Sequence, residues 1–357
     1  MDTAYLVLEN GSVFEGQAFG FMGETLGELV FTTGMSGFLE TLTDPANYGQ
    51  IVLQTFPLVG SYGVIPSDFE SEEVQVKAYI VREWCQEPSN FRSEGSLDIF
   101  LREKKIPGLC GIDTRALTRE IRSHGVMNAM ISRKKDLTAD EMARLKAHKI
   151  TGAVEATSVK EPSTAKNGNA VQKVALWDFG APAKIRQELL KRSCEVITVP
   201  YSYTAEQIAA LAPDGVVLGD GPGNPADNAD IIAEIKAFAQ KKIPTLGIGL
   251  GHQMLAISQG AKTQALPHGH RGSNHPVCEE KTGRLFVTAQ NHGYVVSGES
   301  IADAEMSYIN QNDGTCEGIA YKSIPAISVQ FHPAAHIGIN APESPYDTFV
   351  NMMGRES

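Results

Sequence analysis

Hydrophobic and polar positions follow different rhythms in the two halves of the chain. In the second half, short β-branched runs alternate with segments whose apolar residues recur every three or four positions, which predicts β-α-β-α units. Such units build a mostly parallel sheet covered by helices on both faces. The predicted strands are Val174–Trp177, Glu195–Val199, Gly215–Leu218 and Pro244–Ile248, and the predicted helices are Ala183–Arg192, Thr204–Leu211, Ile231–Lys241 and Gly251–Gln259.

The first half alternates strand-like runs with turns and has two helical patterns, so it predicts a mixed α+β domain. Residues 153–172 are small, polar and aperiodic, and we interpret them as a linker because they offer no apolar face to bury. The predicted domains are residues 1–152 and 173–357. The runs in the first domain are strands Tyr5–Leu8, Glu28–Thr32, Ile51–Gln54 and Val74–Val81, with helices Ser96–Lys104 and Arg115–His124.

Composition and charge narrow the classes of function. The chain has 31 Lys plus Arg against 42 Asp plus Glu, a net charge of −11, which favours neither nucleic acid nor an anionic membrane as partner. No run approaches the roughly 20 apolar residues of a membrane span, and the first residues lack the pattern of a signal peptide. We therefore expect a cytoplasmic protein. Its 5 cysteines are widely spaced without a C-x-x-C pair, so neither a disulfide framework nor a zinc site is indicated.

The most informative stretch is Thr245–Leu255, which has the G-x-(nucleophile)-x-G spacing of a nucleophile elbow between a strand and a helix. In this arrangement the central side chain projects into a cleft. The backbone N–H groups at the start of the helix face a developing oxyanion. Here the central residue is Gly249, which has no side chain, and we predict that it adopts a backbone conformation poorly accessible to residues with a Cβ.

Several motifs together resemble class I (triad) glutamine amidotransferases and, more narrowly, the small subunit of carbamoyl phosphate synthetases. The resemblance spans nearly the whole chain and implies an α/β fold: a mixed α+β domain followed by a mostly parallel, doubly covered sheet of the class I amidotransferase type. In the second half it is carried by the elbow with Gly251-His252-Gln253 and by residues 221–225, 288–294 and 329–333; in the first half by residues 6–11, 34–37, 42–45, 49–51 and 111–115.

In that family a Cys attacks the glutamine carboxamide, a His is general base and acid, and a Glu two residues later orients the His. The resemblance places the nucleophile at Gly249, the base at His332 and the orienter at Ala334. Two of these three groups are therefore replaced. Without an orienting carboxylate, we interpret His332 as structural rather than catalytic.

The resemblance also implies a glutamine pocket whose frame is kept while polar contacts are lost. Pro182, Ala46 and Asp220 stand where the family has Lys, Ser and Asn. The positions that match the family's glutamine-binding residues are Ala46, Gly221, Gly223, Leu250, Gln253, Asn291, Gly293 and Tyr294.

Other interpretations of these motifs are weaker. None of the cysteines lies in the elbow, and Ser258 is more than two turns into the following helix, so a substitute nucleophile is not indicated. A metal site at His268, His270 and His275 lacks Cys or acidic partners at ligand spacing. The loop Gly221–Gly223 lacks the Lys-Ser/Thr of a phosphate-binding loop. We predict no metal and no cofactor in this chain.

Three hypotheses of function differ in class. The first is a working glutaminase subunit, which is disfavoured because Gly249 has no nucleophilic side chain. The second is a silent subunit that docks on the large synthetase subunit, the ATP- and bicarbonate-using partner that the resemblance implies, and supports reaction with free ammonia. In the family, the product serves arginine and pyrimidine synthesis. The third is a repurposed ligand-binding or regulatory protein whose emptied pocket accepts something other than glutamine. Apart from these hypotheses, glutamine or an analogue is a candidate ligand of the residual pocket. The second is favoured, because the motifs of the first half remain.

Overall fold

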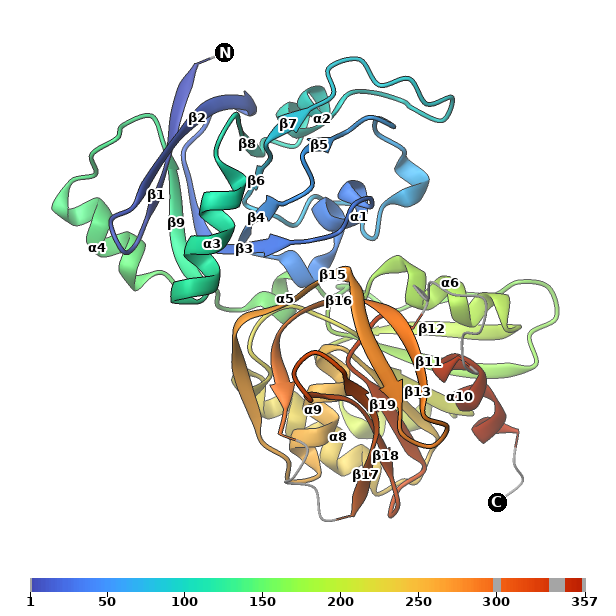
Figure 1. Cartoon of the computed structure of the whole chain (residues 1–357). Coiled ribbons are helices and arrows are strands. Elements are labelled where there is room, and N and C mark those ends of the chain that lie inside the picture. Colours follow the sequence, from blue (N-terminus) through green and yellow to red (C-terminus); the bar gives the residue numbers. More distant parts are fainter. Residues whose placement is uncertain (1, 298–302, 334–343, 355–357) are drawn as a thin grey trace. The chain divides into compact units, whose positions relative to one another are not determined.

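The computed structural model describes residues 2–297, 303–333 and 344–354 (Figure 1). The chain divides into two compact units, Met1–Thr151 with Pro267–Arg271, and Gly152–Leu266 with Gly272–Ser357. Among the described residues, no helix is long and apolar enough to cross a membrane.

The first unit is built on a closed barrel of seven strands in the order β1-β2-β8-β6-β4-β3-β9. Apolar residues alternate along its strands: Leu29 and Ile51 join one buried cluster, and Val30 and Val52 join another on the opposite face. The strands are β1 (Thr3–Leu8), β2 (Val13–Gly20), β3 (Thr25–Thr32), β4 (Gln50–Gln54), β6 (Ala78–Ile80), β8 (Pro107–Cys110) and β9 (Met127–Ser132), with a separate pair β5 (Leu58–Val59) and β7 (Glu83–Trp84).

Four α-helices accompany the barrel, and their caps explain where two of them begin. The Asp113 carboxylate accepts a hydrogen bond from the Ala116 N–H, and Thr138 forms a capping box with Glu141. The helices are α1 (Phe38–Thr43), α2 (Leu97–Glu103), α3 (Thr114–His124) and α4 (Ala139–Ala147), with 3-10 turns at Pro45–Asn47 and Pro66–Asp68. The predicted mixed α+β domain is confirmed.

The second unit contains a ten-stranded sheet in the order β10-β12-β11-β13-β14-β19-β18-β16-β15-β17. Five neighbouring strands of this sheet, β12, β11, β13, β14 and β19, are parallel to one another. The strands that flank them, β10 and β18, pair antiparallel with β12 and β19. The strands are β10 (Ser163–Ala165), β11 (Gln172–Asp178), β12 (Cys194–Pro200), β13 (Gly215–Leu218), β14 (Thr245–Ile248), β15 (Thr263–Glu279), β16 (Arg284–Val296), β17 (Ala304–Asn310), β18 (Cys316–Tyr321) and β19 (Ala326–Val329).

Helices cover both faces of the parallel strands, as predicted. Phe238 of α8 packs with Trp177 in one buried cluster, and Leu189 of α6 and Phe349 of α10 pack with Leu176 in the other. Each cluster is apolar on its helix and its strands, which is what holds a sheet between two helical layers. The helices are α5 (Ala153–Thr157), α6 (Ala183–Lys191), α7 (Ala205–Ala210), α8 (Ala229–Ala239), α9 (Leu250–Ser258) and α10 (Pro345–Met353), with a 3-10 turn at Pro225–Asp227.

The stretch expected as a linker, residues 153–172, is instead part of the second unit. It forms α5, whose Val154 is buried in the core, and β10, which pairs with β12. Gly152, in the left-handed region at φ 62°, lets the chain turn into α5. Both elements are too short to show a period in the sequence.

Candidate functional site

The elbow is formed as the sequence predicts. Gly249 lies between β14 and α9 with φ 54° and ψ −112°, a conformation that residues with a Cβ rarely adopt. Its N–H donates to the Val329 carbonyl at 3.0 Å, which ties the turn to β19. The helix begins at Leu250, one residue before the predicted start at Gly251.

The other glycines of the elbow are required by close packing. A Cβ on Gly251 would overlap the Leu218 carbonyl of β13, and one on Gly247 would lie 3.1 Å from the backbone of the helix that follows. The helix therefore approaches the sheet more closely than a side chain permits. This is the physical reason for the spacing of the motif.

Asp220 is the second residue after β13, and its side chain reaches the centre of the elbow. Its Oδ1 accepts hydrogen bonds from the N–H of Gly221 at 2.7 Å and of Leu250 at 2.8 Å. The residue is 4% exposed. A Cβ on Gly249 would overlap the Asp220 carboxylate, whose atoms are the three nearest. The carboxylate thus occupies the space into which a side chain at the elbow would project.

His332 follows β19 and lies beside the same carboxylate. Its ring atom Nδ1 is 3.8 Å from Asp220 Oδ2, and its backbone N–H donates to the Ala289 carbonyl at 3.0 Å. The imidazole is partly exposed, and Asp220 is the acidic side chain beside it. Ala334, the predicted orienter position, lies outside the described residues.

The predicted binding side chain Gln253 is used within the protein. Its Nε2 donates to the Tyr294 carbonyl at 2.7 Å and to Gln330 Oε1 at 2.8 Å, and it is 3% exposed. These bonds bring β16, which carries Asn291, Gly293 and Tyr294, to the amino-terminal half of α9. The structure therefore brings two of the predicted positions, Gln253 and Tyr294, together at the start of α9.

The loop after β13 carries the other two predicted glycine positions. A Cβ on Gly221 would overlap the Phe179 carbonyl, and Gly223 has φ 90°, so both positions favour glycine. Pro182 is the residue before α6. Ala46 belongs to the first unit, in the turn Pro45–Asn47, where its N–H donates to Asp44 Oδ1 at 3.0 Å.

A buried polar pair on α9 and β19 is absent from the sequence predictions. His252 is fully buried, with Nδ1 2.7 Å from Ser328 Oγ. Burial lowers the pKa of His252 to about 3, so the ring is neutral at ordinary pH. One feature of the sequence could have predicted that His252 is buried. It lies three residues after Gly249, in a helix that is apolar on nearly all sides.

Asp178, at the end of β11, is another buried acid at this edge of the sheet. Desolvation raises the pKa of Asp178, although its carboxylate accepts hydrogen bonds from the N–H groups of Ala181, Val159 and Gly180. These bonds hold the turn after β11. The role of this side chain is therefore structural.

None of the cysteines in the described part of the second unit lies in the elbow. Cys278 is in β15, where it pairs with Ile309 of β17. Cys194 begins β12, at the end of the parallel strands opposite the elbow, and burial raises the pKa of its thiol. Cys316 begins β18, and burial raises the pKa of its thiol to about 12. A thiol with so high a pKa is scarcely ionised at neutral pH and is a poor nucleophile.

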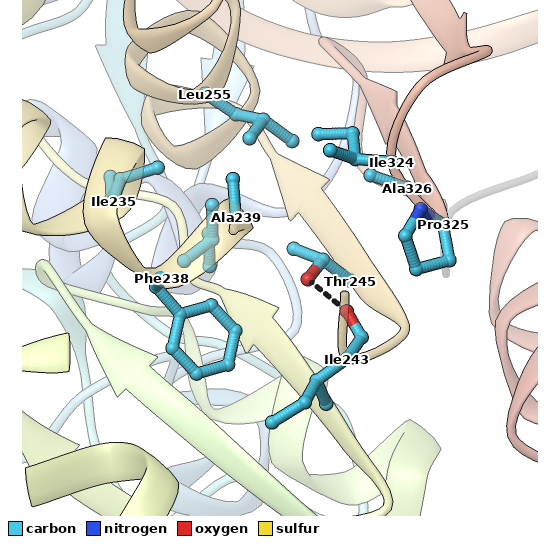
Figure 2. Close-up of a pocket in the computed structure, with 10 residues that line it drawn as sticks. Ile235, Phe238, Ala239, Ile243, Thr245, Leu255, Ile324, Pro325 and Ala326 are labelled. Carbon is cyan, nitrogen blue, oxygen red and sulfur yellow. Dashed lines mark hydrogen bonds between the residues drawn. The ribbon is translucent and has the colours of Figure 1, made fainter. Parts of the chain in front are cut away.

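A small apolar pocket lies at the other end of β14 (Figure 2). Phe238, Leu255 and Pro325 line it, and its one side-chain polar contact among the residues drawn is the Thr245 hydroxyl, which donates to the Ile243 carbonyl at 2.9 Å. Ligand sites of parallel sheets form at the carboxyl ends of the strands. We therefore attribute this pocket to side-chain packing.

The fold of the second unit and its elbow define an amidotransferase-type domain, and residues 175–352 match the family model "Glutamine amidotransferase class-I". Residues 6–131 match "Carbamoyl-phosphate synthase small chain, CPSase domain". The chain is 45% identical over 350 residues to a carbamoyl phosphate synthase small chain of Bacillus cereus, covering 98% of this chain and 95% of that protein. The pyrimidine-specific small chain of Bacillus subtilis is 45% identical over 356 residues with the same coverage. The chain belongs to the carbamoyl phosphate synthase small chain family.

Proposed function

We propose that this chain serves as a carbamoyl phosphate synthase small subunit that has no glutaminase activity of its own. It docks on a large subunit that uses ATP and bicarbonate, and the complex makes carbamoyl phosphate from free ammonia. The family to which the chain belongs supports the partner, and the likeness to the B. subtilis protein supports a role in pyrimidine synthesis.

One observation carries the loss of glutaminase activity. The elbow keeps its backbone conformation at Gly249, but no side chain projects from it, so no covalent intermediate with glutamine can form there. Hydrogen bonds of the oxyanion type stabilise a transition state only once a nucleophile attacks. Binding energy elsewhere in the pocket does not replace that bond.

The second group of the triad is also changed in its surroundings. His332 faces the Asp220 carboxylate at 3.8 Å rather than a thiol. A base without a nucleophile to deprotonate contributes nothing to acyl transfer. The absence of a nucleophilic side chain at Gly249 is therefore enough to abolish glutaminase activity, and the changed surroundings of His332 add little to that loss.

The test measures glutamate release from glutamine by the purified chain, alone and with its large subunit. We expect no release above a buffer control, no covalent adduct with glutamine by intact mass, and carbamoyl phosphate synthesis by the complex from ammonium salts. Glutamate release that persists through repeated purification and disappears in His332→Ala would overturn the proposal. Failure of the two chains to associate would instead favour a repurposed ligand-binding protein.

A further inference from the structure

Two backbone N–H groups at the elbow are the donors expected to stabilise the oxyanion of acyl transfer. The Leu250 N–H is the first of α9, directly after the nucleophile position, and the Gly221 N–H lies on the facing loop after β13. In an elbow enzyme such donors point to the place where the substrate oxygen gains negative charge. Here both converge on one atom, Asp220 Oδ1, at 2.8 and 2.7 Å.

A carboxylate oxygen is chemically close to that oxyanion. Both are negatively charged oxygens, and hydrogen bonds from N–H groups to charged oxygens are about twice as strong as neutral ones. Asp220 is also almost completely buried. The carboxylate therefore satisfies the two donors from within the protein and leaves neither for a ligand.

The same carboxylate fills the volume of the missing nucleophile. The three atoms nearest to a Cβ at Gly249 all belong to the Asp220 carboxylate. These atoms end a flexible side chain and can move, but only by breaking both hydrogen bonds to Gly221 and Leu250. A side chain at position 249 and this conformation of Asp220 exclude each other.

We infer that Asp220 is a specificity-determining residue that closes the elbow: its carboxylate occupies both oxyanion donors and the nucleophile's space, so the pocket rejects the glutamine carboxamide. This inference rests on the proposed function, in which the elbow carries out no acyl transfer. The remaining oxygen, Oδ2, faces His332 and gives that side chain an acidic neighbour in place of a triad orienter.

The first experiment uses an introduced thiol as a probe of the elbow. Gly249→Cys is made with and without Asp220→Asn, and alkylation of that site by iodoacetamide at pH 7 is followed by peptide mass spectrometry. A neighbouring carboxylate raises the pKa of a thiol, and a rise of about one unit lowers the thiolate fraction about tenfold. We expect Asp220→Asn to raise the alkylation rate about tenfold.

Asp227→Asn is the matched control, since Asp227 is an exposed acid on the same loop and its replacement removes the same charge. It should leave the rate within about twofold, as expected for a screened surface charge. Cys85, half-buried in the first unit, serves as an internal reference in every sample. Equal alkylation rates with Asp220 and with Asp220→Asn would overturn the inference.

A second measurement needs no reactive thiol. Gly249→Ala is compared in the natural chain and in Asp220→Ala by thermal unfolding. The strain at φ 54° is common to both comparisons, so their difference isolates the overlap with the carboxylate. We expect the loss of Tm to be larger by about 3 °C or more when Asp220 is present. An equal loss in both backgrounds would show that the carboxylate does not hold this space.

Neither readout involves glutamine turnover, so the two proposals fail separately. Glutamate release by the natural chain would contradict the proposed function whatever the thiol shows. Unchanged thiol reactivity and an additive Tm cycle would contradict the role of Asp220 even in a chain that never hydrolyses glutamine. Hydrogen exchange gives a third check, since Asp220→Ala should speed exchange of the Leu250 N–H, which loses its acceptor.

Discussion

The two ends of the parallel strands in the second unit differ in what they bury. At the amino end of β14, the pocket of Figure 2 is lined almost wholly by apolar side chains such as Phe238 and Ile324. At the carboxyl end, Asp220, Gln253 and His252 are buried and polar. Apolar side chains gain stability from burial alone, whereas buried polar groups need specific partners.

Three buried polar side chains at the carboxyl end form hydrogen bonds with other groups of the protein. Gln253 donates to Tyr294 and Gln330, Asp220 accepts from two N–H groups, and His252 meets Ser328. A working site keeps some polar groups aimed at the substrate. At this edge of the sheet the frame of such a site is present, and the polar groups of Asp220 and Gln253 are directed inward. The comparison predicts large functional effects at one end and large stability effects at the other.

The largest effect is expected from repair of the carboxyl end. Gly249→Cys alone should release very little glutamate, and adding Ala334→Glu should help more than either change alone, because triad members act as a unit. Adding Asp220→Ala removes the side-chain acceptor of the Gly221 and Leu250 N–H groups, so it should free the oxyanion donors and bring the total gain to about 10³-fold over Gly249→Cys. The measurement is the initial rate of glutamate release by all eight combinations.

His332→Ala in the triple variant is the control and should return the rate to background. Substantial turnover by Gly249→Cys alone would show that the natural pocket is competent. In that case the inward-directed polar groups would not prevent glutamine hydrolysis. The comparison between the two ends of the strands would then no longer explain the missing activity.

At the amino end the expected effect is on stability. Phe238, 2% exposed, packs edge-on against Trp177 with ring centroids 6.5 Å apart. Phe238→Ala should lower the free energy of unfolding by about 3–5 kcal/mol through lost burial and the cavity left behind. Denaturant unfolding measures it, with Phe238→Leu as the control that keeps most of the volume. A loss below 1 kcal/mol for the Ala variant would mean that this end is loosely packed.

The sequence predicted the part of the second unit that local pattern controls. Gly215–Leu218 matches β13 at both ends, and Gly249 lies at the elbow because the glycine spacing leaves few alternatives. The long strands β15 and β16 were not predicted, since their polar and apolar residues do not alternate regularly. They are neighbours in the sheet, joined by the turn at residues 280–283, and each also pairs with a more distant strand, β17 or β18. Non-local pairing leaves little trace in a local pattern.

The candidate site shows the same limit. The sequence identified Asp220 as a departure from the family, but its hydrogen bond to Leu250 joins residues 30 positions apart and depends on how β13 and β14 are aligned. The pairing of His252 with Ser328 spans 76 positions. The sequence alone identified residues of the candidate site, whereas their hydrogen-bond partners could be identified only from the folded structure.

A smaller effect should appear when pH is lowered, again at the carboxyl end. The pKa of His252 is about 3 in the folded chain and about 6.5 when unfolded, so the unfolded chain binds more protons between these values. The free energy of unfolding therefore falls as pH drops below about 6.5, by about 2 kcal/mol at pH 5. His252→Gln should flatten this dependence in denaturant titrations at pH 7 and pH 5.

The control for that measurement is His124→Gln, because His124 lies exposed on α3 beside Glu120. It should leave the His252-dependent slope in place. If the slope between pH 7 and pH 5 were the same with and without His252→Gln, other groups would account for the acid sensitivity. The buried imidazole would then not distinguish the two ends of the sheet.

The smallest effect tests whether backbone donors at the carboxyl end are satisfied locally. Thr204 follows β12 and begins α7 with a capping box, its hydroxyl accepting from the Gln207 N–H while the Gln207 side chain accepts from the Thr204 N–H. Thr204→Ala leaves one N–H without its acceptor and should lower the free energy of unfolding by about 1 kcal/mol. Thr204→Ser keeps the hydroxyl and should cost less than half as much in the same denaturant titration. Equal losses for Ala and Ser would show that the methyl group, rather than the hydrogen bond, stabilises the start of α7.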